Sequence, residues 1–161
     1  MTIQSGDQIP NATFTVMAPD GPQLRTTDQI FKGHKVVLFG VAGAFTPVCD
    51  KHHLPGFLDN LDQFKAQGVD EIAVTAVNDV FVMEAWAKSA GADGKISFLA
   101  DGNGDFARAL GLSLDLTARG LGIRSQRYAM IVDDSVVRKL NVEAAPAKVE
   151  ASSAEALLKQ L

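Results

Sequence analysis

An uninterrupted apolar run, Lys35-Val-Val-Leu-Phe-Gly-Val41, is the feature that most constrains the fold of this chain. A strand with one face in water alternates apolar and polar residues, and this run does not alternate. It is therefore predicted to be a strand covered on both faces, as in the largely parallel sheets of α/β proteins. Such sheets need helices as crossover connections, so helices are expected on both of its sides.

Segments with strand and helix patterns alternate along the rest of the chain. Strands are expected over 72–77, 96–100, 127–132 and 136–142, the last two joined as a hairpin by Asp133-Asp134-Ser135. Helices are expected over 54–64, with an end near Gly68, and over 81–89, 106–110 and 153–161. The fold class is thus α/β, a mixed central sheet with helices on both faces. No linker, repeat or low-complexity tract interrupts it, so residues 1–161 are expected to form one domain.

Composition excludes several classes of protein. Hydrophobic residues make up 47% and charged residues 21% of the chain, which is incompatible with intrinsic disorder. The formal net charge of −4 argues against a nucleic-acid partner. No apolar run approaches the roughly 20 residues that span a bilayer, and MTIQSGDQIP does not read as a secretory signal. With one cysteine no internal disulfide forms. A cytoplasmic protein without a membrane partner is expected.

A candidate site follows the strand that ends at Val41, because ligands of such sheets bind beyond the carboxyl ends of parallel strands. Thr46 suits an N-cap and Pro47 the first helical position, which places Cys49 in the first turn of a helix. The free N–H groups and the helix dipole there favour thiolate, the nucleophilic form of cysteine. The Thr46 hydroxyl lies one turn back, where it can bond to the sulfur or to a substrate.

Other interpretations of these residues are also open. A lone cysteine is usually a packing residue, although packing does not require a helix N-terminus. His52 and His53 lie three and four residues after Cys49, which permits a Cys–His metal site or a Cys–His nucleophile pair. A metal site is disfavoured because His34 is the only other histidine. A structural hydrogen bond is the expected role, with His52 facing solvent, and Pro55 should kink the helix just past the site.

Three arginines precede or begin a late strand. Arg119 and Arg124 are interpreted as solvated surface charges. Arg127 is the first residue of its strand, and the place of that strand in the sheet could bring the Arg127 guanidinium beside the helix of Cys49.

The sequence resembles the peroxiredoxins, and most closely the atypical, type-five subgroup, over nearly its whole length. The most specific stretch is Gly40-Val-Ala-Gly-Ala-Phe-Thr46-Pro-Val-Cys49, continued by His53-Leu-Pro-Gly-Phe57. Further matches are Val77-Asn-Asp79 with Phe81-Val82, Trp86, Leu99-Ala-Asp-Gly-Asn-Gly104 and Gly122-Ile-Arg-Ser-Gln-Arg127-Tyr-Ala-Met130.

The resemblance implies a thioredoxin-like fold and a thiol peroxidase that reduces hydrogen peroxide and organic hydroperoxides without metal or other cofactor. Cys49 would be the peroxidatic cysteine, and the Thr46 hydroxyl would bond to the peroxide. The backbone N–H groups of Val48 and Cys49 would hold the attacked oxygen. Arg127 would stabilise the thiolate and the leaving oxygen, with Phe45 and His53 in support.

Two departures from the family pattern bear on shape and turnover. Ala42 stands where the family has a proline that shields the thiolate. The C-terminal region reads Glu150-Ala-Ser-Ser153, without the resolving cysteine of some members. A Cys49 sulfenic acid would thus need an external thiol. Glutathione, with or without glutaredoxin, is the favoured reductant and thioredoxin the second choice, and a homodimer is expected. The alternative is a peroxide sensor or redox partner-binding module without efficient turnover.

Overall fold

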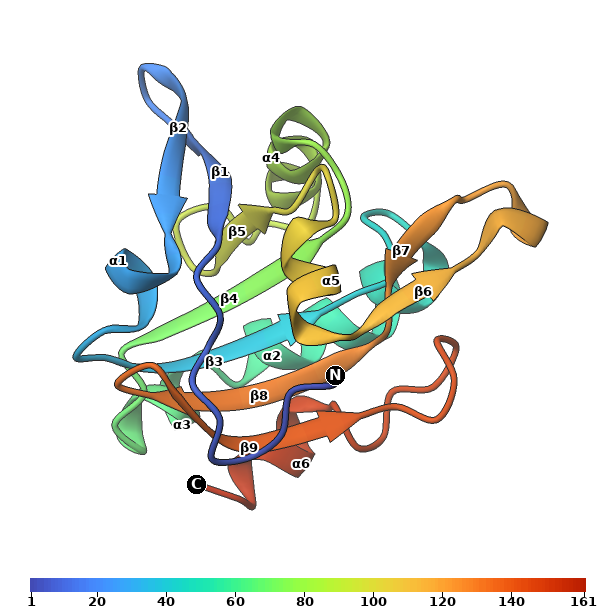
Figure 1. Cartoon of the computed structure of the whole chain (residues 1–161). Helices are drawn as coiled ribbons and strands as arrows, with labels where there is room; N and C mark the ends of the chain where they lie inside the picture. The colour runs from blue at the N-terminus through green and yellow to red at the C-terminus, as the bar shows by residue number, and fades with distance from the viewer.

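The computed structural model describes residues 1–161, which fold around a central seven-stranded sheet (Figure 1). The strand order is β2-β1-β5-β4-β3-β8-β9. Strands β3, β4 and β5 run parallel, whereas β1, β2, β8 and β9 pair antiparallel to their neighbours. The seven strands are β1 (Thr13–Ala18), β2 (Gly21–Thr26), β3 (Lys35–Gly40), β4 (Glu71–Ala76), β5 (Ser97–Ala100), β8 (Tyr128–Asp133) and β9 (Val136–Val142). The sheet is mixed, as predicted.

Six short α-helices and two other helical turns connect the strands. They are α1 (Thr27–Phe31), the π-helical η1 (Cys49–His53), α2 (Leu54–Asp59), α3 (Leu61–Ala66), α4 (Val80–Ser89), α5 (Asp105–Leu110), the 3-10 turn η2 (Thr117–Arg119) and α6 (Ala154–Leu158). Strands β6 (Ser113–Asp115) and β7 (Ile123–Ser125) form a separate small ribbon that projects from the body (Figure 1). No helix of the structure has the length and apolar character that a membrane span requires.

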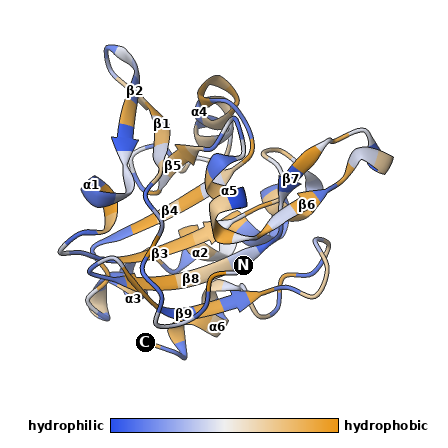
Figure 2. Cartoon of the chain, viewed as in Figure 1, coloured by the Kyte–Doolittle hydropathy of each residue, from blue (hydrophilic) through white to orange (hydrophobic).

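The side chains of β3 are buried on both of its faces, which confirms the prediction from the apolar run. Val37 and Phe39 belong to one hydrophobic cluster, and Val36 and Leu38 to a second cluster on the opposite face. All four side chains are fully buried. Figure 2 shows the same strand as one of the most hydrophobic parts of the centre of the molecule.

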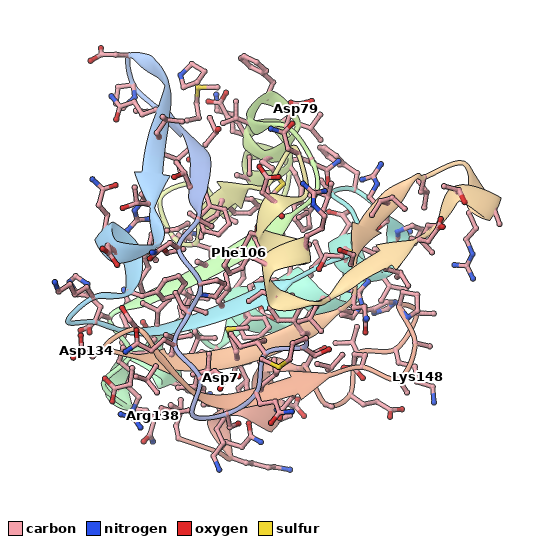
Figure 3. All side chains as sticks on the ribbon, viewed as in Figure 1. Asp7, Asp79, Phe106, Asp134, Arg138 and Lys148 are labelled. Atoms are coloured by element: carbon pink, nitrogen blue, oxygen red, sulfur yellow. The ribbon has the colours of Figure 1, made fainter.

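The two clusters show which helices cover which face. Helices α2, α3, α4 and α6 contribute Leu54, Phe64, Trp86 and Leu157 to the cluster that contains Phe39. Helices α1 and α5 contribute to the other cluster, in which Phe106 (labelled in Figure 3) packs edge-on against Phe14. Helices therefore lie on both faces, as predicted.

Some local predictions are wrong. The helix predicted over 54–64 is broken at Asn60, whose amide donates to the Gly56 carbonyl. The irregularity expected just past the site at Pro55 is instead the π-helical turn η1, which contains Cys49 itself. The N-terminal region, for which no element was predicted, contains β1, β2 and α1. By contrast, the hairpin is confirmed, and the helix predicted over 153–161 is present as α6, with Ser153 as its N-cap.

The carboxyl end of β3 requires a glycine. Gly40 pairs with Tyr128 across the β3–β8 ladder, and a Cβ at position 40 would lie 2.2 Å from the Tyr128 ring. That ring is almost completely buried, so it has little room to move. The close approach fixes the point at which the chain leaves the sheet for the loop before Cys49.

We expect Gly40→Ala to lower the free energy of unfolding by roughly 1–3 kcal/mol, because the new methyl group overpacks a full site. Urea denaturation would measure the change. Gly102→Ala is the matched control, since its Cβ would meet nothing closer than 3.6 Å and its effect should stay within about 0.5 kcal/mol. Equal stability of the two variants would contradict the argument.

Candidate functional site

The loop after β3 turns sharply and begins a helix at Pro47. Asp50 N–H donates to the Thr46 carbonyl at 2.9 Å, which closes the first helical turn. The Thr46 hydroxyl does not cap that turn, contrary to the prediction, but donates to the Gly43 carbonyl at 2.6 Å. Phe45 has a left-handed backbone with φ of 64° and a side chain that is 46% exposed. The loop therefore holds Thr46 by its backbone and by its hydroxyl proton.

Two backbone donors beside Cys49 have no partner within the chain. The N–H groups of Val48 and Cys49 make no hydrogen bond, as is usual for the first turn of a helix. The Cys49 side chain is fully buried, and the next residue, Asp50, accepts a bond from the Trp86 indole at 2.8 Å. The turn that carries the sulfur is thus anchored to α4 while its N–H groups remain free.

Arg127 lies immediately before β8 and reaches the sulfur. Its side chain is only 2% exposed. Nη2 donates to Cys49 Sγ at 2.8 Å, Nη1 bonds to His53 Nδ1 at 2.8 Å, and Nε donates to the Pro146 carbonyl at 2.8 Å. Antiparallel pairing of β8 with β3 places the start of β8 beside the end of β3. The sheet therefore brings together residues 78 positions apart.

The Arg127 charge has no carboxylate beside it. The three ion pairs of the structure, Arg25–Glu71, Lys88–Glu84 and Arg108–Asp105, do not include it. A buried cation without an anion is costly, because burial removes the water that would otherwise solvate it. The guanidinium therefore relies for its hydrogen bonds on the sulfur and on two neutral acceptors.

His53 is buried between Arg127 and the C-terminal segment. Its ring packs against Phe39 and Phe57, with centroids 4.9 and 5.6 Å away. Its Nε2 lies 2.9 Å from the Ser152 carbonyl, which can only accept, so Nε2 carries the proton and Nδ1 accepts from Arg127. Burial, together with the Arg127 charge, lowers the pKa of His53 from 6.5 to about 4. The ring is therefore neutral at neutral pH.

Glu143 and Ser152 extend this chain of contacts, and neither was among the predicted site residues. Glu143 Oε2 accepts from the Ser152 N–H at 2.7 Å, the Ser152 hydroxyl at 2.5 Å and the Glu150 N–H at 2.8 Å. Burial acts to raise the pKa of Glu143, but these hydrogen bonds outweigh it and lower that pKa. No motif marks the pair, because the contacts depend on how the chain folds back after β9.

The other candidate residues lie outside this network. Arg119 and His52 are exposed, as expected. The interpretation of Arg124 as a solvated surface charge is wrong: its side chain is half-buried and donates to the Leu121 and Val77 carbonyls. Its guanidinium also stands 3.3 Å from the Cβ position of Gly43, so it supports the loop before Cys49. No three His, Cys, Asp or Glu side chains gather as a metal site would require.

Comparisons with known proteins agree with this geometry. Residues 4–158 match the Redoxin family. Peroxiredoxin-2E-2, chloroplastic, of Oryza sativa subsp. japonica is 47% identical over 99% of this chain and 73% of its own. The chain belongs to the peroxiredoxins. Like them it is a thiol peroxidase, an oxidoreductase that acts on a peroxide with the help of a reducing thiol, and its fold is thioredoxin-like.

Solved structures confirm the fold of this peroxiredoxin. Reduced Prx3 of Vibrio vulnificus, solved in complex with H₂O₂, has a TM-score of 0.94 and 48% identity over 99% of each chain. A Burkholderia cenocepacia structure described as a putative thioredoxin reductase has a TM-score of 0.96 and 44% identity over 100% of this chain and 99% of that one. The present chain has one cysteine, so no dithiol can form within it.

The lowered pKa of His53 predicts a pH-dependent stability. Between pH 6.5 and about 4 the unfolded chain binds a proton at His53 and the folded chain does not, so stability falls as the pH falls through this window. The loss attributable to His53 should reach roughly 3 kcal/mol. Urea denaturation at a series of pH values would measure it. His53→Gln keeps a donor and an acceptor but does not titrate, and a difference between the two proteins that is independent of pH would contradict the prediction.

Proposed function

We propose that Cys49 is the peroxidatic nucleophile of this peroxiredoxin and that Arg127 and Thr46 activate it. The observation that carries the proposal is the 2.8 Å contact between Cys49 Sγ and Arg127 Nη2. It lies in the same helical turn as the unpartnered N–H groups of Val48 and Cys49. A cation and free helix N–H groups are the two features that make a thiolate stable and reactive.

The reaction is a displacement at oxygen. The Cys49 thiolate attacks the terminal oxygen of the hydroperoxide, an S–O bond forms and the O–O bond breaks. Sulfur is oxidised to a sulfenic acid, and the peroxide is reduced to an alkoxide or hydroxide that takes a proton from water. Negative charge moves from sulfur to the leaving oxygen, and Arg127 and the free N–H groups are fixed donors that can stabilise it as it moves.

Thr46 acts as an acceptor in this proposal. Its hydroxyl proton is committed to the Gly43 carbonyl, so the oxygen presents only lone pairs to a ligand. The terminal oxygen of a hydroperoxide carries an O–H, which can donate to Thr46 while the peroxide oxygens accept from Arg127 and the backbone. This pairing orients the terminal oxygen for attack. Ala42, which stands where the family has a proline, is itself buried at the start of this loop.

Stopped-flow oxidation by hydrogen peroxide tests these roles. We expect wild-type protein to gain one oxygen at a rate far above that of free cysteine, and Cys49→Ser to gain none. Arg127→Ala should slow oxidation by roughly 100-fold, because it removes the charged donor that faces the sulfur. Arg119→Ala, an exposed arginine, is the matched control and should react like wild type. Equal rates for the two arginine variants would remove Arg127 from the mechanism.

Turnover is proposed to follow a one-cysteine route with glutathione as the preferred reductant. No second cysteine exists in the chain, and the buried position of Cys49 disfavours a disulfide between the Cys49 residues of two copies. One glutathione would condense with the sulfenic acid to release water and form a mixed disulfide. A second glutathione, or glutaredoxin, would attack that disulfide and restore the thiol.

We expect many turnovers of hydrogen peroxide with glutathione plus glutaredoxin, and slower turnover with thioredoxin. Consumption of NADPH through each coupled reductase measures this. Intact mass of the enzyme quenched after one glutathione equivalent should show a glutathione adduct on wild type and none on Cys49→Ser. A single oxidation event without turnover in either system would favour the alternative, a peroxide sensor or redox partner-binding module.

A homodimer is proposed as the assembly. Phe45 on the loop before Cys49, Phe81 in α4 and Ile123 in β7 are exposed by 46%, 64% and 47%. Hydrogen bonds from Ala44 N–H to Asn78 and from Arg124 to the Val77 carbonyl connect the neighbourhoods of these three residues. Exposed apolar side chains of this kind fit an interface with a second copy of the chain. Sedimentation velocity would measure the oligomeric state directly. Cytoplasmic location stays a prediction, since the rice relative is named as chloroplastic.

A further inference from the structure

We propose that Glu143 is a positioning residue for the peroxidatic step: it holds Ser152, and through Ser152 and His53 it fixes the direction in which Arg127 donates. The inference rests on the proposed roles of Cys49 and Arg127 and extends them to a carboxylate that touches neither residue. It assigns a function to the segment between β9 and α6, residues 143–153, which contains no residue of the proposed reaction itself.

The carboxylate of Glu143 acts on the fold of this segment. One oxygen, Oε2, accepts three hydrogen bonds, two from Ser152 and one from the Glu150 backbone. Glu143 is 8% exposed and Ser152 is fully buried, so water does not compete strongly for these bonds. The Glu143 N–H in turn donates to the Arg127 carbonyl at 2.9 Å. The segment is thus tied at its start to the backbone of Arg127 and near its end to the Glu143 side chain.

The bound segment presents two carbonyl groups to the site. The Ser152 carbonyl accepts from His53 Nε2 at 2.9 Å, and the Pro146 carbonyl accepts from Arg127 Nε at 2.8 Å. The first contact fixes the His53 tautomer, so that Nδ1 offers its lone pair to Arg127 Nη1. With Nε and Nη1 both held, the planar guanidinium can aim Nη2 in only one direction, which is toward Cys49 Sγ. By contrast Lys148, on the same segment, points away from the body (Figure 3).

The position of the carboxylate explains why it acts at a distance. A carboxylate in direct contact with Arg127 would neutralise the guanidinium and compete with the thiolate for it. Glu143 instead bonds to the segment, and neutral acceptors complete the contact with Arg127. Its role is therefore geometric: what matters is where an acceptor oxygen stands relative to Ser152, rather than the charge on that oxygen.

Two conservative variants separate geometry from charge. Glu143→Gln keeps an acceptor oxygen at the same reach but removes the charge. Glu143→Asp keeps the charge but withdraws the oxygens by one methylene. Glu150→Ala, on the same segment, removes an exposed carboxylate whose side chain makes no hydrogen bond, and is the matched control. We expect Glu143→Asp to lower the rate constant for oxidation by hydrogen peroxide by roughly 10- to 100-fold, as small misplacements of a catalytic group do. Glu143→Gln and Glu150→Ala should remain within a few-fold of wild type.

The readouts are the second-order rate constant and the pH profile of thiolate absorbance, with the melting temperature alongside. A purely structural role would lower the melting temperature of Glu143→Asp but leave its rate constant and thiolate profile like those of wild type, and that result would overturn the proposal. A loss in Glu143→Gln as large as that in Glu143→Asp would overturn it too, since charge would then be decisive. If wild type itself reacted no faster than free cysteine, the proposed function would fail instead.

Discussion

The site depends on one buried cation that has no carboxylate next to it. Arg127 is 2% exposed, and its contacts are a carbonyl, a neutral imidazole and the Cys49 sulfur. Had an acid occupied any of these positions, it would have paired with the guanidinium directly. The fold instead leaves Arg127 to neutral acceptors and the sulfur, and the proposed roles of Cys49 and Arg127 rest on this geometry.

The sheet brings Arg127 and Cys49 together. Strand β3 ends where Gly40 meets Tyr128, and Arg127 is the residue before Tyr128. On β3, the strand next to β8, the loop to Cys49 starts one residue after Gly40. An antiparallel neighbour at this edge is needed, because it places the beginning of one strand beside the end of the other. Gly40 keeps this register fixed, since a shift of one residue would place a side chain against the buried Tyr128 ring.

Elements with strong hydrophobic patterns and residues with distinctive local chemistry could be predicted from the sequence. Strand β3 was predictable from an apolar run, and the position of Cys49 in a first helical turn from Thr46 and Pro47. The bond between Arg127 and Cys49 could be suggested but not shown, because it joins residues brought together only by strand order. Glu143 and Ser152 were missed for the same reason. Arg124 was misjudged because charged side chains are usually solvated, and its two carbonyl acceptors come from separate loops.

The π-helical turn η1 has a consequence for how the helix is built. Successive residues of an α-helix advance by about 100° around its axis, so every side chain is locked in phase with the rest. The wider turn from Cys49 to His53, closed by the Leu54 N–H on the Cys49 carbonyl, breaks this lock. The turn that carries the sulfur can face Arg127 while the turns that carry Leu54 and Phe57 face the sheet. The side chains at the start of this helix are therefore oriented by the contact with Arg127, and those further along by packing in the hydrophobic core.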